Sequence, residues 1–131
     1  MTKAKGRFAV TSWHEDTYEE LDGGGKLTRA SVEQAFTGDI SGESAVQWLM
    51  CYGSDGTAVF VGLQRVRGSL GERSGSFVLE TAGEFDGNEA KGSWSVVACS
   101  GTAGLRGLRG AGKFRAPHGP QATFELEYEF V

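Results

Sequence analysis

The sequence has 131 residues, of which 39% are hydrophobic and 23% charged, and its formal net charge is −4. These values are ordinary for a single globular domain, which we place over residues 1–131. The acidic balance argues against a nucleic-acid-binding protein, which needs a basic face. No apolar run approaches the length of about 18 residues that would indicate a membrane-spanning helix.

The first ten residues, MTKAKGRFAV, lack the apolar core and cleavage site of a secretion signal. We therefore expect a cytoplasmic protein in which Cys51 and Cys99 are reduced thiols. Neither cysteine belongs to a Cys-x-x-Cys pair, so the sequence predicts no metal site, and no cofactor is expected.

Alternation of apolar and polar residues with a period of two, typical of strands with one buried face, dominates the chain. Turn signals such as DGGGK at 22–26 and GSDGT at 53–57 separate the runs. Helical periodicity is weak, with one candidate helical turn in HEDTYEEL at 14–21. We expect strands at roughly 6–13, 27–38, 44–53, 57–67, 73–85, 91–99, 105–115 and 121–131.

The fourth of these segments has two apolar faces. Ala58, Phe60, Gly62 and Gln64 alternate with Val59, Val61, Leu63 and Arg65. Something should therefore cover each side of this strand, and the valine and leucine face indicates a surface on which two copies could pair as a homodimer. The last segment alternates cleanly, with Phe124, Leu126, Tyr128 and Phe130 on the face expected to be buried.

Eight strands joined in sequence order by tight turns predict an all-β fold. The expected architecture is a single closed or nearly closed antiparallel eight-stranded up-and-down barrel. An interior of this size holds either side chains or one small ligand.

Glycine, with 21 residues, well exceeds its usual share of about 7%. The stretch GTAGLRGLRGAGKF at 101–114 places Gly101, Gly104, Gly107 and Gly110 three apart. A collagen register would need more triplets and proline, and a phosphate loop would need a helix after it. We favour glycines along a strongly coiled strand, where neighbouring backbones approach closely.

Four motifs carry a family resemblance: KLTRASVEQAFTGDISGES at 26–44, LMCYGSDGTAVFVGLQRVRG at 49–68, RSGSFVLETAGEF at 73–85 and WSVVACSGTAGLRGLRGAGKF at 94–114. The chain resembles a bacterial family of unknown function in the allene-oxide-cyclase-like, or calycin-like, group of β-barrels. The resemblance implies an eight-stranded barrel with a pocket at one mouth. It also implies departures: the family pattern has glutamates at the positions of Gln64 and Gly104, and Pro-Gly at Ala98-Cys99.

The candidate catalytic residues are Gln64, Cys99 and Cys51. Gln64 could either orient a ligand through its amide or satisfy buried polar groups. The cysteines could be nucleophiles, although no neighbouring cation is present in the sequence to activate them, and inert thiols are the commoner case. The candidate ligand-binding residues are Phe60, Gln64, Trp48, Tyr52, Phe77, Trp94 and Tyr128.

Acidic residues and a histidine gather after the first strand, in a group of His14, Glu15, Asp16, Glu19 and Glu20. Such a group at a barrel rim could hold a general base or a metal, but its spacing fits no established ligand motif, so a solvated acidic loop is expected. The second histidine, His118, lies in APHGP at 116–120, which we expect to form a rigid turn with His118 facing water.

Three functions remain open from the sequence. The first is a binding module for a small apolar or aromatic molecule, with a mainly apolar, aromatic-lined pocket. The second is an isomerase or cyclase that folds an unsaturated or polyketide-type substrate by proximity and orientation. The third is a filled barrel that acts as a structural or interaction protein.

Overall fold

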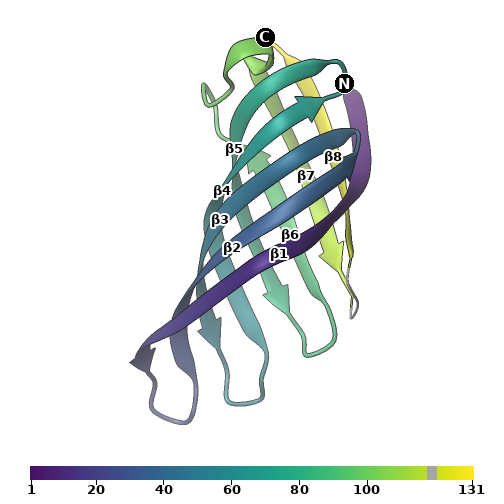
Figure 1. The fold of residues 1–131 in the computed structure, drawn as a ribbon. Coiled ribbons are helices and arrows are strands. Elements are labelled where there is room, and N and C mark those ends of the chain that lie inside the picture. Colours follow the sequence, from purple (N-terminus) through teal and green to yellow (C-terminus); the bar gives the residue numbers. More distant parts are fainter. Residues whose placement is uncertain (118–120) are drawn as a thin grey trace.

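Eight strands form one closed antiparallel barrel in sequence order, as predicted (Figure 1). The computed structural model describes residues 1–117 and 121–131, so His118 and most of its predicted turn lie outside the described residues. The elements are β1 (Thr2–Glu20), β2 (Lys26–Gly38), β3 (Ile40–Tyr52), β4 (Ala58–Leu70), β5 (Arg73–Phe85), β6 (Ala90–Val96), the short 3-10 helix η1 (Ala103–Leu105), β7 (Leu108–Ala116) and β8 (Ala122–Phe130).

The first strand is much longer than expected. β1 pairs with β2 as far as Glu20, which is opposite Lys26, so the candidate helical turn at 14–21 is wrong. Pairing with β2 keeps this polar segment extended although its own residues show no strand alternation. β8, by contrast, pairs with β1 only from Thr2 to Phe8. The β1–β2 hairpin therefore projects beyond the rest of the barrel (Figure 1).

The connection between β6 and β7 also differs from expectation. β6 ends at Val96, before the expected strand end at 99, and Cys99 lies in a turn with a φ of 66°. The chain then crosses β5, where the Thr102 N–H donates to the Ser76 carbonyl at 2.9 Å. Only the second half of the glycine stretch is strand: Gly110 lies in β7, whereas Gly101 and Gly104 lie in the connection.

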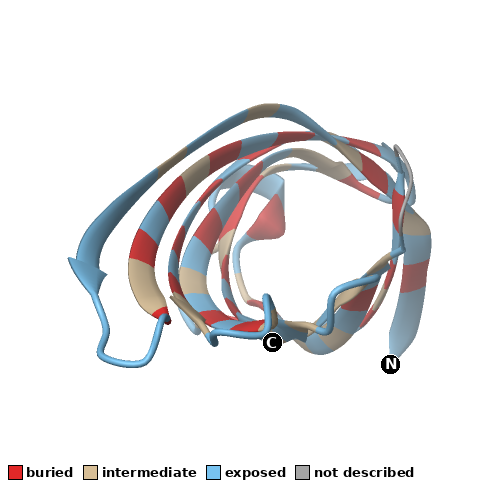
Figure 2. Ribbon diagram, turned by 90° about the horizontal axis from the view of Figure 1, so that it is seen from below, coloured by how far each residue is buried: buried red, intermediate tan, exposed pale blue. Residues whose placement is uncertain are grey.

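The two ends of the barrel differ. The β1–β2, β3–β4 and β5–β6 connections lie at one end, and the short helix η1 lies at the other (Figure 1). At the η1 end the interior is filled by buried side chains, which include Ile40, Leu70, Phe77, Leu105 and Leu108. Seen from the hairpin end, buried and exposed residues alternate along the strands, as expected when one face lines the interior (Figure 2).

Most buried aromatic residues are directly paired with a glycine on a neighbouring strand. The pairs are Phe36 with Gly42, Trp48 with Gly62, Phe60 with Gly83, Trp94 with Gly112, Phe114 with Gly92, and Phe124 with Gly6. At Gly6, Gly62, Gly83 and Gly92, an added Cβ atom would lie only 2.6–2.7 Å from the facing ring. The interior rings therefore occupy space that a side chain on the next strand would otherwise fill, which accounts for part of the high glycine content.

Replacing Gly92 with alanine should overpack this arrangement. The new Cβ atom would lie 2.6 Å from Phe114 ring atoms and 2.9 Å from the Ala82 carbonyl oxygen. We expect Gly92→Ala to lower the free energy of unfolding by about 1–3 kcal/mol, measured by urea denaturation. The control is Ser93→Ala on the exposed side of the same strand, which should change it by less than about 0.5 kcal/mol. Equal stability of the two variants would contradict the role of the glycines.

Candidate functional site

The hairpin end of the barrel contains a cavity of about 270 Å³, which we call the cup. Its lining is almost entirely apolar, and more than half of the lining residues are aromatic. The lining residues are Phe8, Val10, Trp13, Gln34, Trp48, Met50, Tyr52, Phe60, Phe85, Ala90, Phe114 and Ala116. None of these described residues carries a charge at neutral pH. The arrangement can hold a small apolar body and offers few polar contacts to orient it.

The walls of the cup are rings packed against one another. The Trp48 ring centroid is 5.1 Å from that of Phe60 and 5.8 Å from that of Trp13. The indole Nε1 of Trp48 is buried without a hydrogen-bond partner, so Trp48 presents ring carbon to the cup. Beneath the walls, Trp94 stacks on Phe114 at 5.7 Å and separates the cup from the filled end.

A buried amide network lies at the floor. The Gln64 Nε2 donates to Gln34 Oε1 at 2.7 Å, and the Ser44 hydroxyl donates to the same oxygen at 3.0 Å. All three side chains are buried, but only Gln34 lines the cup. Gln64 therefore lies behind the floor, where it positions Gln34. Gln34 was not among the residues predicted for the site, although its alternation with Val32 and Phe36 places it on the inner face of β2.

A β-bulge in β1 decides which residues reach the mouth. Val10 pairs with Gln34 and Ser12 with Glu33, so Thr11 is an extra residue in the ladder. Before the bulge the even-numbered residues of β1 point inward, and from the bulge to Thr17 the odd-numbered residues do; a second register shift follows between Thr17 and Glu19. Trp13 and Glu15 consequently face the interior, where regular alternation would have directed them to the outer surface.

Glu15 is the acceptor at the centre of a polar cluster on the rim. Its Oε2 accepts hydrogen bonds from Thr28 Oγ1 and from the Tyr52 hydroxyl, both at 2.7 Å, and its Oε1 accepts one from Trp13 Nε1 at 3.0 Å. Partial burial alone would raise the pKa of this carboxyl, but the three hydrogen bonds and the nearby Lys26 together lower it. Burial and the adjacent Glu15 charge raise the pKa of Tyr52, so its hydroxyl stays protonated.

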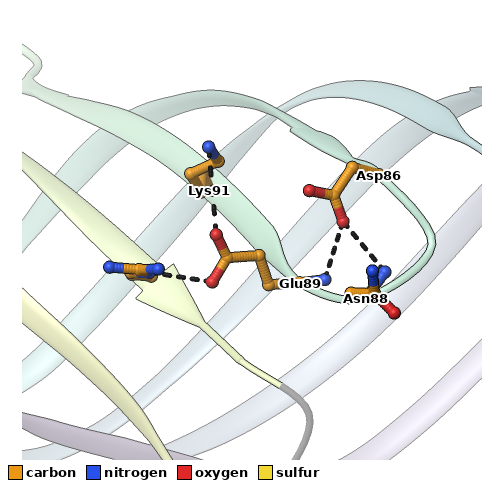
Figure 3. A network of polar contacts seen from close by, with 5 residues as sticks. Asp86, Asn88, Glu89 and Lys91 are labelled. Carbon is orange, nitrogen blue, oxygen red and sulfur yellow. Dashed lines mark hydrogen bonds and ion pairs between the residues drawn. The ribbon is translucent and has the colours of Figure 1, made fainter.

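The β5–β6 turn on the opposite rim is fixed by a second carboxylate network (Figure 3). The Asp86 side chain accepts from the backbone N–H groups of Asn88 and Glu89, both at 2.9 Å. Glu89 in turn accepts from Arg115 Nε at 2.8 Å and lies 3.8 Å from Lys91 Nζ. These contacts tie the turn to the end of β7, next to Ala90 and Ala116 of the cup.

The structure brings together some of the predicted site residues and not others. Trp48, Tyr52 and Phe60 line the cup. Phe77 and Trp94 are buried in the core, and Tyr128 lies near the filled end, in edge contact with Phe130.

The two cysteines are also placed away from the cup. Cys51 alternates with the inward residues Met50 and Tyr52 on β3 and lies on the outer side, paired with Val59. Cys99 is exposed in the turn after β6. Among the described residues, no three His, Cys, Asp or Glu side chains form a group that could hold a metal ion. In the acidic segment of β1, His14, Asp16 and Glu19 are exposed.

Comparison with known proteins finds a family and similar solved structures. The family model described as "Protein of unknown function (DUF3224)" matches residues 4–128. A crystal structure from Shewanella oneidensis MR-1, described as a protein with unknown function from the DUF3224 family, is similar to this chain. The two are 29% identical, with a TM-score of 0.81 over 100% of this chain and 98% of the other. No curated protein matches. Within the described residues, there is no helix with the length and apolar character to cross a membrane.

The hydrogen bonds to Glu15 predict a pH dependence of stability. Because its pKa is lowered in the folded state, its stabilising effect is complete above the ordinary glutamate pKa of about 4.3 and is lost as the pH falls through the folded value. We expect Glu15→Gln to be less stable than the wild type at neutral pH, with the difference closing in acid. Urea denaturation across the acid range measures this. The exposed-side control Glu19→Gln should show no such closing, and a constant difference for Glu15→Gln would contradict the prediction.

Proposed function

The chain belongs to the DUF3224 family of proteins of unknown function, and we propose that it binds a small, mainly apolar or aromatic molecule in the cup. One observation carries the proposal: the interior is filled at the η1 end but hollow at the hairpin end, where aromatic rings border a cavity of about 270 Å³. Such a volume falls just below the range of about 300 Å³ and more that is usual for drug-sized ligands. A molecule of one or two rings is the appropriate size.

A larger hollow lies on the outer surface, over β1, β6, β7 and β8, with a volume of about 780 Å³. Its lining includes Lys5, Arg7, Lys113 and Arg115, whose side chains are exposed. It is an open depression across the sheet, and its charged groups partly pair with Glu125 and Glu89. The cup is the better ligand site because it is more enclosed and its lining is almost entirely apolar.

An isomerase or cyclase acting on an unsaturated or polyketide-type substrate is the alternative. The closed eight-stranded barrel supports a relationship with the allene-oxide-cyclase-like group, and a ring-lined cup could fold such a substrate by orientation alone. The described residues that line the cup include no carboxylate, histidine or cysteine. Binding without an acid–base step therefore fits the lining better than catalysis.

Filling the cup should abolish binding without removing its walls. Ala90 lines the cup and is half-buried, so Ala90→Phe places a ring in the hollow. We expect the wild type to bind tert-butylbenzene saturably, as measured by quenching of tryptophan fluorescence, and Ala90→Phe to lose that binding at least about tenfold. Ala82→Phe, on the exposed face of β5, is the matched control and should bind as the wild type does. Saturable binding that survives Ala90→Phe would place the site elsewhere.

We further propose that the outer face of β4 pairs two copies of the chain. Val59, Val61 and Leu63 are each more than half exposed, at 57%, 56% and 58%. Cross-strand pairing places Leu49, itself 50% exposed, directly beside Val61. The sequence predicted a cover for this side of the strand, and none of the described residues supplies it. Contiguous exposed apolar side chains of this kind usually mark an interaction surface.

A charge on this face should then separate the copies. We expect the wild type to sediment as a dimer at micromolar concentration and Leu63→Glu to sediment as a monomer, because dimerisation would bury an unpaired carboxylate. Leu21→Glu, in the β1–β2 hairpin, is the control and should leave the sedimentation coefficient unchanged. A monomeric wild type would refute the pairing.

A further inference from the structure

The aromatic walls of the cup favour a positive charge. Trp13, Trp48, Tyr52, Phe60 and Phe114 all border the same cavity. The face of an aromatic ring carries negative potential and attracts cations within about 6 Å of its centre, most strongly for tryptophan. A cation in the cup would meet several such rings at once. No lysine or arginine among the described lining residues competes for them.

The rim already shows one such contact. The Lys26 ammonium lies 5.2 Å from the centre of the Tyr52 ring. Lys26 lines the neighbouring hollow on the rim with Glu15 and Thr28 and is absent from the lining of the cup. The ring of Tyr52 therefore accepts a cation from the rim side, while no lysine or arginine in the described part of the chain lines the deeper part of the cup.

A fixed carboxylate stands next to the cup. Glu15 is hydrogen-bonded directly to Trp13 and Tyr52, which are both wall residues. These bonds come from neutral donors and hold the carboxylate behind the wall without neutralising its charge, and Lys26 faces the same carboxylate from the neighbouring hollow. A cationic group among the outer rings would lie beside this charge, whereas an anionic group would be repelled by it.

The electrostatic potential around the open mouth of the cup is negative, like the charge of Glu15. The acidic residues of the projecting part of β1 and the hairpin turns are Glu15, Asp16, Glu19, Glu20, Asp22, Asp55, Asp86 and Glu89. The described basic residues near them are Lys26, Arg29, Lys91 and Arg115. Since the acidic groups outnumber the basic ones, the mouth attracts cations over longer distances.

From these features we infer that the ligand of the cup is a small organic cation: an amine or quaternary ammonium with an aromatic or aliphatic body, whose charged nitrogen lies among the outer rings beside Glu15. This inference rests on the proposed function, since it names the chemical class of the molecule that the cup binds. The apolar body would occupy the floor above Gln34 and Phe8. The ring faces and the Glu15 carboxylate would take the place of the water molecules that hydrate the charged nitrogen in solution.

Two probes of equal shape distinguish the effect of a positive charge on affinity from the effect of molecular shape. Phenyltrimethylammonium and tert-butylbenzene differ by one positive charge, and phenylacetate supplies a negative one. Quenching of tryptophan fluorescence reports their affinities, because Trp13 and Trp48 border the cup. At an ionic strength of about 0.15 M, which screens distant charges, we expect the cation to bind about tenfold more tightly than its neutral isostere. Phenylacetate should bind more weakly than both.

A matched pair of variants distinguishes the effect of direct contact with Glu15 from the effect of the other acidic residues around the mouth. Glu15→Gln removes the carboxylate beside the cup, and Glu19→Gln removes an exposed one on the same strand. We expect Glu15→Gln to weaken phenyltrimethylammonium binding about fivefold and to leave tert-butylbenzene within about twofold, which shows that the cup is intact. Glu19→Gln should leave both affinities unchanged. If Glu15→Gln binds neither phenyltrimethylammonium nor tert-butylbenzene, the relative affinities of the wild type for these two probes decide whether the cup prefers a cation.

The possible failures are distinguishable. Equal affinity for the cation and its isostere would overturn the inference and leave the proposed function standing. Tighter binding of phenylacetate would overturn it in favour of a carboxylate ligand at Lys26. Equal losses of phenyltrimethylammonium affinity in Glu15→Gln and Glu19→Gln would show that direct contact with Glu15 does not contribute to binding. If none of the three probes binds, the proposed function itself fails.

Discussion

The interior of this barrel depends on one steric arrangement: an aromatic ring on one strand lies over a glycine on the next. Trp48 over Gly62, Phe60 over Gly83 and Phe114 over Gly92 follow one another around the sheet. Below the cup the rings also meet across the barrel, where the ring centroid of Phe36 lies 6.0 Å from that of Trp94 and that of Phe60 lies 6.2 Å from that of Phe114. The cup lies above these rings at the hairpin end, whereas buried side chains and η1 fill the other end.

The same arrangement determines what the cup can do. Because its walls are rings and its lining has no charged group, selectivity must come from shape, from ring faces and from the few polar groups at the floor and rim. Gln34 is held from behind by Gln64 and Ser44, and Glu15 is held by Trp13, Thr28 and Tyr52. Both polar groups are fixed before a ligand arrives, so binding does not require them to be ordered.

Alternation along each strand predicts inside and outside, and it correctly gave an all-β barrel and placed Trp48, Tyr52 and Phe60 in its interior. It does not predict height along the barrel axis, which depends on strand tilt and register between distant segments. For this reason Phe77, Trp94 and Tyr128 share the inner face and still miss the cup. The bulge at Thr11 was likewise invisible, because an extra residue leaves no local pattern, and it moved Trp13 and Glu15 to the inner face. Cys99 lies outside its expected strand because the connection that follows Val96 leaves β6 and forms backbone hydrogen bonds to β5.

The most direct test of a hollow bordered by these rings uses the two methionines. Met50 lines the cup and Met1 is exposed at the terminus. Apolar cavities that exclude water bind xenon, so a protein labelled at the methionine methyl groups can be observed by NMR under xenon pressure. We expect the Met50 methyl resonance to shift saturably while that of Met1 stays unchanged. A Met50 resonance that does not move, or that moves no more than Met1, would show that the cup is closed by its own side chains.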